Sequence, residues 1–119
     1  MTYVSFRYDG EKGCGYATSK LFTAGSEVQL DIVDFVADPA AAEALLAQIH
    51  AFAREQRASQ VNIWLNRNHP SFFLLERSGY AHTTPINWLG YRPLQPNDQL
   101  DHLRNYDNWY VTMGDSDVY

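Results

Sequence analysis

The sequence is poor in cysteine, in basic residues and in long apolar runs, and each shortage excludes a class of protein. Cys14 is the only cysteine, which excludes an internal disulfide and fits the reducing cytoplasm, where we expect the protein to act. The nine Lys and Arg residues are scattered against fourteen acidic ones, which excludes a basic nucleic-acid stripe or a polybasic membrane patch. No apolar run approaches the roughly 20 residues that span a bilayer, and the first residues lack a signal-peptide pattern.

Metal-ligand spacing is also missing from the sequence. None of the four histidines lies at ligand spacing from a cysteine or carboxylate, so no metal site is predicted. No Ser/His/Asp order or carboxylate pair typical of hydrolases stands out either. Asp115 and Asp117 near the end of the chain have two readings, a weak cation site or a solvated acidic tail.

The sequence does contain the pattern of one α/β domain of 119 residues with 45% hydrophobic content. Strands are predicted over residues 3–8, 15–22 and 28–36, followed by a helix over 39–57 and a strand over 61–66. A second helix is predicted over 70–78, with closing strands over 80–91 and 109–113. Strand, helix and strand from 28 to 66 are typical of a parallel crossover. We therefore predict a single domain with a mixed twisted sheet and helices on its faces.

The strand over 28–36 carries an interruption in its alternation. Val28, Leu30 and Ile32 alternate with polar residues, but Val33 follows Ile32 directly before Asp34 takes the next polar position. One extra residue in a period-two pattern indicates a β-bulge. A bulged strand bends away from its neighbour and leaves backbone groups that can be offered to a ligand.

The long helix has a recognisable start and the short helix a recognisable end. Asp38 is predicted to cap the first helix amides, and Pro39 occupies the tolerated first position. Leu45, Ile49 and Phe52 share one face of this helix. Gly79 is predicted to end the short helix as a left-handed cap.

The order of these elements resembles the later two-thirds of the GNAT superfamily of acyl-CoA-dependent N-acetyltransferases. Three stretches carry the resemblance. Gly15-Tyr16-Ala17 is similar to the glycine–hydrophobic–alanine start of the family's third strand. Residues 68–80 are similar to the family pattern of Asn, a small residue three positions on, an aromatic, Glu, a base, any residue, Gly and Phe. Residues 109–117 resemble a closing strand with an acidic end.

The chain departs from the family at three places. The family's pyrophosphate loop has glycines at the helix start, whereas the matching positions are Ala37, Ala40 and Ala42. Asp38 places a carboxylate in the anion site, and Pro39 removes an amide donor. Leu75 stands where many members have a tyrosine that protonates the departing thiolate. The family's first strand and first two helices find no room before residue 3, so we expect an N-terminally incomplete GNAT-like domain.

Asp31 and Asp34 are the candidate catalytic residues, because the resemblance places a general base on the bulged strand. The alternative reading of each is a polar residue on the solvated face of the sheet. Tyr80 and Tyr91 are alternative acids, although packing on the sheet is the favoured interpretation of both. Acetyl-CoA, for which weak or absent binding is predicted, would lie between residues 31–36 and 61–66. The candidate cofactor-binding residues are Val33, Phe35, Val36, Ala40 and Asn68.

Two functions follow from the resemblance. The first is acetyl transfer from acetyl-CoA to an unknown amine, with this chain as the C-terminal part of the enzyme and inactive alone. The alternative is a non-catalytic GNAT-like module used for dimerisation or partner binding. The uncovered edge of the strand over 3–8, or the sheet face that the family's first helices cover, predicts a homodimer.

Overall fold

The structure, a computed structural model, describes residues 1–82. Within them, residues 1–65 belong to one compact unit and residues 66–82 to a second. The predicted strand over 109–113 and residues 83–91 of the other closing strand lie outside the described residues. No helix within residues 1–82 is long and apolar enough to cross a membrane. The single domain predicted from the sequence stays a prediction.

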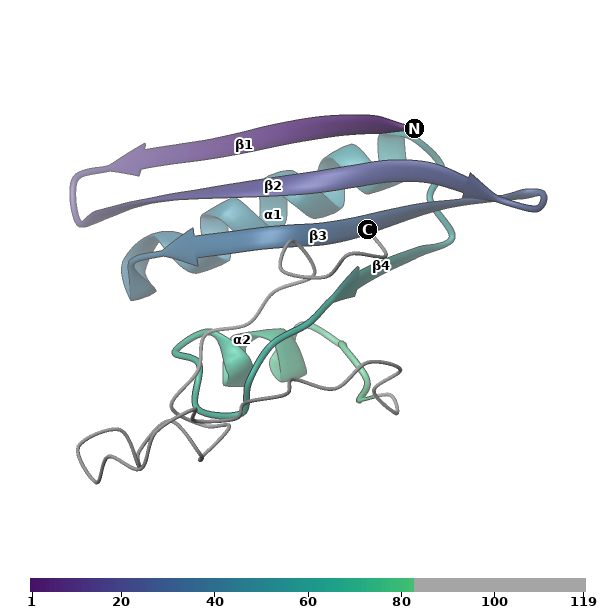
Figure 1. Ribbon diagram of the computed structural model, residues 1–119. Helices are drawn as coiled ribbons and strands as arrows, with labels where there is room; N and C mark the ends of the chain where they lie inside the picture. Colours follow the sequence, from purple (N-terminus) through teal and green to yellow (C-terminus); the bar gives the residue numbers. More distant parts are fainter. Residues whose placement is uncertain (83–119) are drawn as a thin grey trace, which may run out of the picture. The chain divides into compact units, whose positions relative to one another are not determined.

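The first unit contains a four-stranded mixed sheet in the order β1-β2-β3-β4 (Figure 1). Strands β1 (Thr2–Gly10), β2 (Gly13–Ala24) and β3 (Glu27–Ala37) pair antiparallel, and β4 (Gln60–Ile63) pairs with β3 in parallel. Helix α1 (Pro39–Glu55) connects β3 to β4, which is the predicted crossover. The α/β fold with a mixed sheet is therefore confirmed, and within residues 1–65 the order of elements is the one predicted from the sequence.

The predicted bulge lies at Val33 of β3. Ile32 pairs with Ser19 and Asp34 pairs with Thr18, so two neighbouring residues of β2 span three residues of β3. The parallel ladder with β4 ends at the pair Ile32–Ile63, immediately before the bulge. The strand predicted over 61–66 consequently spans only Gln60–Ile63, because the bulge turns β3 out of register with the residues that follow.

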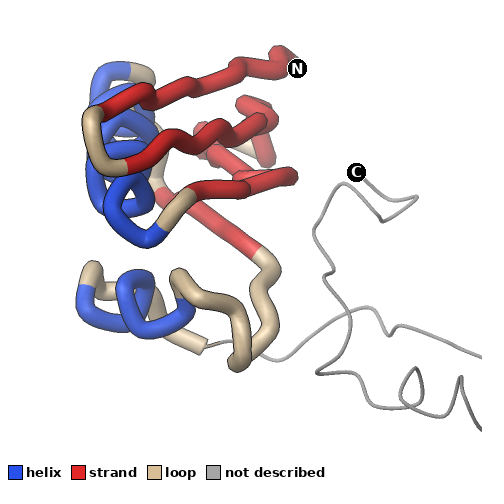
Figure 2. The backbone as a smooth tube through the Cα atoms, turned by 90° about the vertical axis from the view of Figure 1, so that its left-hand side faces the viewer, coloured by secondary structure: helices blue, strands red, loops and turns tan. Residues whose placement is uncertain are grey.

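Helix α1 covers one face of the sheet and contacts all four strands (Figure 2). The face it covers includes Phe6, whose ring packs edge-to-face on Phe52 of α1 with centroids 5.5 Å apart. The side chains in this layer are almost fully buried and form the core, as the helical periodicity predicts. They are Ala17, Leu30, Ile32, Phe35, Ala41, Ala42, Leu45, Leu46, Ile49 and Ala53.

Helix α1 ends at Glu55, two residues before the predicted end at 57, because Arg57 adopts a left-handed conformation with φ of 58°. The amide of Ala58 donates to the carbonyl of Ala53 at 2.9 Å, which closes the last turn. An arginine pays a steric penalty in this conformation that glycine does not.

The substitution Arg57→Gly is therefore expected to stabilise the protein by about 0.5–1 kcal/mol. Urea unfolding of the natural and substituted proteins measures this change. The matched control is Gln56→Gly, one residue earlier, where φ is −80° and glycine brings only added flexibility in the unfolded chain. Equal destabilisation by both substitutions would contradict the steric argument.

The second unit contains helix α2 (Phe72–Arg77), which is shorter than the predicted 70–78. Gly79 has φ of 95° and forms the predicted left-handed cap, with the amide of Tyr80 donating to the carbonyl of Leu75 at 3.1 Å. Residues 80–82 form no strand, so the start of the predicted closing strand over 80–91 is wrong. The closed helix end occupies the backbone of Gly79 and Tyr80, which a strand start would need.

Candidate functional site

The bulge at Val33 places Asp31 and Asp34 on the same face of the sheet. Residues three apart in a regular strand point to opposite faces. Asp31 instead pairs with Lys20 and Asp34 pairs with Thr18, and these two residues of β2 share one face. The two carboxylates therefore both lie on the face opposite α1, about two residue steps apart along β2. Without the extra residue, one of them would point into the core.

Asp31 is a buried carboxylate at the last stretch of β3 that still pairs with β4. Its side chain is 2% exposed, and its Oδ1 accepts a hydrogen bond from the amide of Asn62 on β4 at 2.9 Å. Burial raises the pKa of Asp31 above its ordinary value, while the Asn62 hydrogen bond and the charge of Lys20 offset part of the rise. A carboxylate with a raised pKa is a stronger proton acceptor than an exposed one, which is what a general base requires.

Asp34 lies on the other side of the bulge and pairs with a tyrosine. The hydroxyl of Tyr16 on β2 donates to Oδ2 of Asp34 at 3.1 Å. This hydrogen bond raises the pKa of Tyr16, because the carboxylate stabilises the protonated phenol. Tyr16 is 48% exposed, so the pair can be reached from solvent. The bulge is thus flanked by one buried and one accessible carboxylate.

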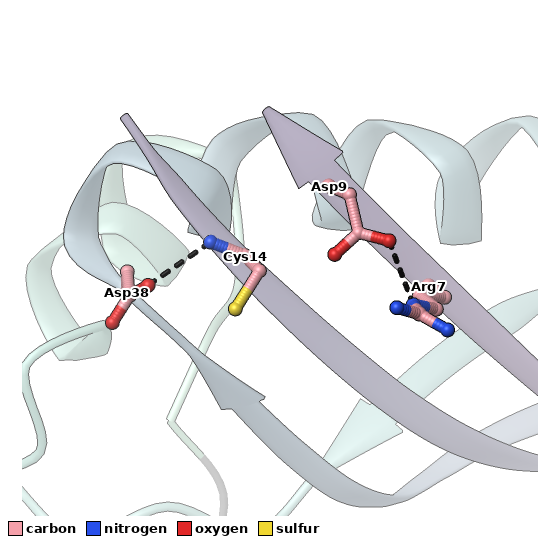
Figure 3. A network of polar contacts seen from close by, with 4 residues as sticks. All are labelled: Arg7, Asp9, Cys14 and Asp38. Carbon is pink, nitrogen blue, oxygen red and sulfur yellow. Dashed lines mark hydrogen bonds and ion pairs between the residues drawn. The ribbon is translucent and has the colours of Figure 1, made fainter. Parts of the chain in front are cut away.

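The polar groups of Asp38 at the start of helix α1 form hydrogen bonds with strand β2. The carboxylate of Asp38 accepts from the amide of Cys14 at 2.9 Å (Figure 3). The amide of Asp38 donates back to the carbonyl of Cys14 at 2.9 Å. The prediction that the Asp38 side chain caps the helix is therefore wrong, since it bonds β2 instead. The amides of Ala41 and Ala42 donate to the Asp38 carbonyl. Because Pro39 has no amide, this helix start is a poor phosphate site.

Two glycines of β2 allow this close approach. A Cβ on Gly13 would lie 2.9 Å from the Cβ of Asp38, and one on Gly15 would lie 2.6 Å from the Cβ of Ala37. Either contact is shorter than packing tolerates. Gly15 of the Gly15-Tyr16-Ala17 stretch is therefore required by packing. Ala17 is fully buried on the face of the sheet that α1 covers.

The structure separates the candidate cofactor-binding residues. Val33 and Phe35 are 7% and 1% exposed, and Phe35 pairs with Ala17 on the face that α1 covers. Val36 is 44% exposed and lies on the opposite face, paired with Tyr16. Ala40 is exposed at the start of α1. Asn68 belongs to the second unit, so its predicted place beside the bulged strand stays a prediction.

The second unit contains Leu75 and Tyr80, the positions considered above as the acid that protonates the departing thiolate. Leu75 is 5% exposed on α2 and carries no proton to give. Burial raises the pKa of Tyr80 to about 12, so its phenol keeps its proton at neutral pH. Among residues 1–82, no group of three or more His, Cys, Asp or Glu side chains is placed to hold a metal ion.

Sequence reasoning missed Tyr16 and Asn62 as partners of the two carboxylates. Tyr16 was expected only as part of a strand signature, and Asn62 as a residue of β4. The bulge could have predicted the partner of Asp34, because the extra residue at Val33 shifts Asp34 onto the face of Tyr16. The burial of Asp31 has no counterpart in the alternation, which predicts a solvated side chain.

Comparisons with known proteins show the fold. No protein-family model matches the chain, and no curated protein does either. The crystal structure of TTHA1254 from Thermus thermophilus is 20% identical over 78% of this chain and 72% of that chain, with a TM-score of 0.60. A mutant of the same protein is 18% identical over the same shares, with a TM-score of 0.61. An acetyltransferase of Trypanosoma brucei is 22% identical over 65% of this chain and 58% of its own, with a TM-score of 0.49.

Proposed function

We propose that this chain carries GNAT-type chemistry, in which an acetyl group passes from acetyl-CoA to an amine. The observation that carries the proposal is the bulge at Val33, where β3 stops pairing with β4 and two carboxylates flank the break on one face. The continuation of β3 beyond Ile32 supplies backbone for an extended ligand between the diverging strands.

Asp31 is the base in this proposal. An amine that is protonated in water must lose a proton before its nitrogen attacks the thioester carbonyl. The buried carboxylate of Asp31, held in place by Asn62, accepts that proton. Attack forms the carbon–nitrogen bond, and the carbon–sulfur bond then breaks. The second proton that the nitrogen loses passes through water to the departing thiolate, since Leu75 supplies none. Asp34, paired with Tyr16, adds negative charge that attracts a cationic amine.

The chain holds acetyl-CoA weakly in this proposal. Asp38 keeps a negative charge at the start of α1, where a pyrophosphate would otherwise meet a positive helix end. The same observation favours the second candidate function, a non-catalytic GNAT-like module for dimerisation or partner binding. The cytoplasmic location inferred from the single cysteine stays a prediction.

A thiol-release assay with acetyl-CoA and a panel of primary amines separates the two functions. Acyl transfer predicts slow release that depends on the amine and rises in proportion to acetyl-CoA up to millimolar concentrations, because binding is weak. A control without amine measures hydrolysis. Release equal to that control with every amine would favour the non-catalytic module.

A further inference from the structure

Strand β1 forms a long and regular edge of the sheet. In the part of the chain that the structure describes, β1 is the outermost strand and pairs only with β2 (Figure 1). Its pairing runs without a shift from Thr2–Leu21 to Gly10–Gly13, so no bulge twists it away. It also contains no proline. Alternate amides and carbonyls of such a strand point away from the sheet, where they can pair with another strand.

We propose that β1 pairs with β1 of a second copy of this chain, antiparallel about a two-fold axis at Phe6. This arrangement uses all nine residues of the strand, with Thr2 opposite Gly10 of the other copy. It joins the two sheets into one continuous sheet that carries both α1 helices on the same face.

The side chains of β1 match themselves in this register. On the face that α1 covers, Phe6 meets Phe6 of the second copy, and Val4 meets Tyr8. Cross-strand aromatic and β-branched pairs of this kind stabilise antiparallel sheets. On the opposite face, Arg7 meets Ser5 and Asp9 meets Tyr3, so like charges are never directly opposite.

Neighbouring registers fit less well. An axis at Arg7 would place the two Arg7 side chains opposite each other, which is unfavourable. An axis at Tyr8 would pair Arg7 with Asp9 of the second copy but leave only residues 6–10 overlapping. The axis at Phe6 combines full overlap with apolar pairs on one face and uncharged partners on the other.

The charges of β1 give it little protection against pairing. Arg7 Nε lies 2.7 Å from Asp9 Oδ2, with the two side chains 79% and 58% exposed (Figure 3). Charges on edge strands normally repel a second edge. Here the two charges neutralise each other within one strand, so the edge of β1 itself presents no net charge to a second β1. Tyr3 lies on the same face of β1, is 54% exposed and gains cover from Asp9 of the second copy.

Sedimentation equilibrium tests the proposal, with about twice 13.6 kDa expected at tens of micromolar protein. Ser5→Lys places a lysine opposite Arg7 of the other copy at two symmetric positions, and the dimer Kd is expected to weaken about tenfold. The matched control is Thr23→Lys, which adds the same charge at an exposed position of the interior strand β2. Thermal unfolding of each variant checks that the monomer fold is kept.

A charge-restoring variant makes the test specific for the register. In Ser5→Lys/Arg7→Glu, each lysine faces a glutamate of the other copy, and the dimer Kd is expected to return to within about threefold of the natural value. A monomeric natural protein would overturn the proposal. So would equal weakening by Ser5→Lys and Thr23→Lys, or a double variant no tighter than Ser5→Lys alone.

Discussion

The substitution Asp31→Asn is expected to lower amine-dependent thiol release by about 100- to 10,000-fold while stabilising the fold at neutral pH. Asparagine keeps an oxygen that accepts the Asn62 amide but cannot take a proton from the amine. Steady-state thiol release at several acetyl-CoA concentrations measures the loss as a smaller slope of rate against acetyl-CoA concentration, which is kcat/KM.

The stability gain follows from the raised pKa of Asp31. The folded state binds this proton more tightly than the unfolded chain, in which the pKa lies near its ordinary value of 3.8. The associated stability is therefore present below that value and is lost as the pH rises through the higher folded pKa. Asp31→Asn removes this loss, so urea unfolding between about pH 4 and pH 7 is expected to show a flatter pH profile and a higher free energy of unfolding at pH 7.

Asp34→Asn is the matched control, because it removes the second carboxylate of the same face. It leaves the base in place and is expected to reduce thiol release by less than Asp31→Asn, chiefly through a higher KM for a cationic amine. If Asp34→Asn abolished release and Asp31→Asn did not, the base would be Asp34, with Tyr16 as its hydrogen-bond donor.

Acetyl-CoA is expected to bind the natural chain with a Kd weaker than about 100 µM, and Asp38→Asn to tighten it about three- to tenfold. Asparagine still accepts the hydrogen bond from the Cys14 amide, so the contact between the helix start and β2 is kept. What changes is the negative charge at the helix N-terminus, which opposes a pyrophosphate. Calorimetric titration measures both affinities.

Glu43→Gln supplies the control for charge. It removes one negative charge from the same helix, one turn beyond its start, and is expected to change the affinity by less than twofold. Micromolar or tighter binding by the natural chain would contradict the prediction. Equal tightening by Asp38→Asn and Glu43→Gln would show that net charge, and not the helix start, limits binding.

Local patterns in the sequence were sufficient for most of the fold of residues 1–65. Period-two alternation located β1, β2 and β3, and its single interruption located the bulge at Val33, because a bulge is an insertion into that very period. Proline at position 39 marked the start of α1, and the apolar spacing marked the face of α1 that is buried. These features depend on residues close together in the chain, so they can be read before any tertiary contact is known.

The candidate site depended on contacts between distant residues, and here the tertiary structure decided. Asp38 stands at a helix-cap position in the sequence, but its carboxylate accepts a hydrogen bond from the amide of Cys14, 24 residues away. Strand β4 ends at Ile63 because its partner β3 bulges, and the sequence of residues 61–66 does not itself predict this end. Asp31 occupies a polar position in the alternation, yet folding buries it beside Asn62 and raises its pKa. The sequence alone determined that the two carboxylates lie on the bulged strand. Tertiary packing decided their common face, their hydrogen-bond partners and the pKa of Asp31, because desolvation and cross-strand hydrogen bonds exist only once the strands are assembled.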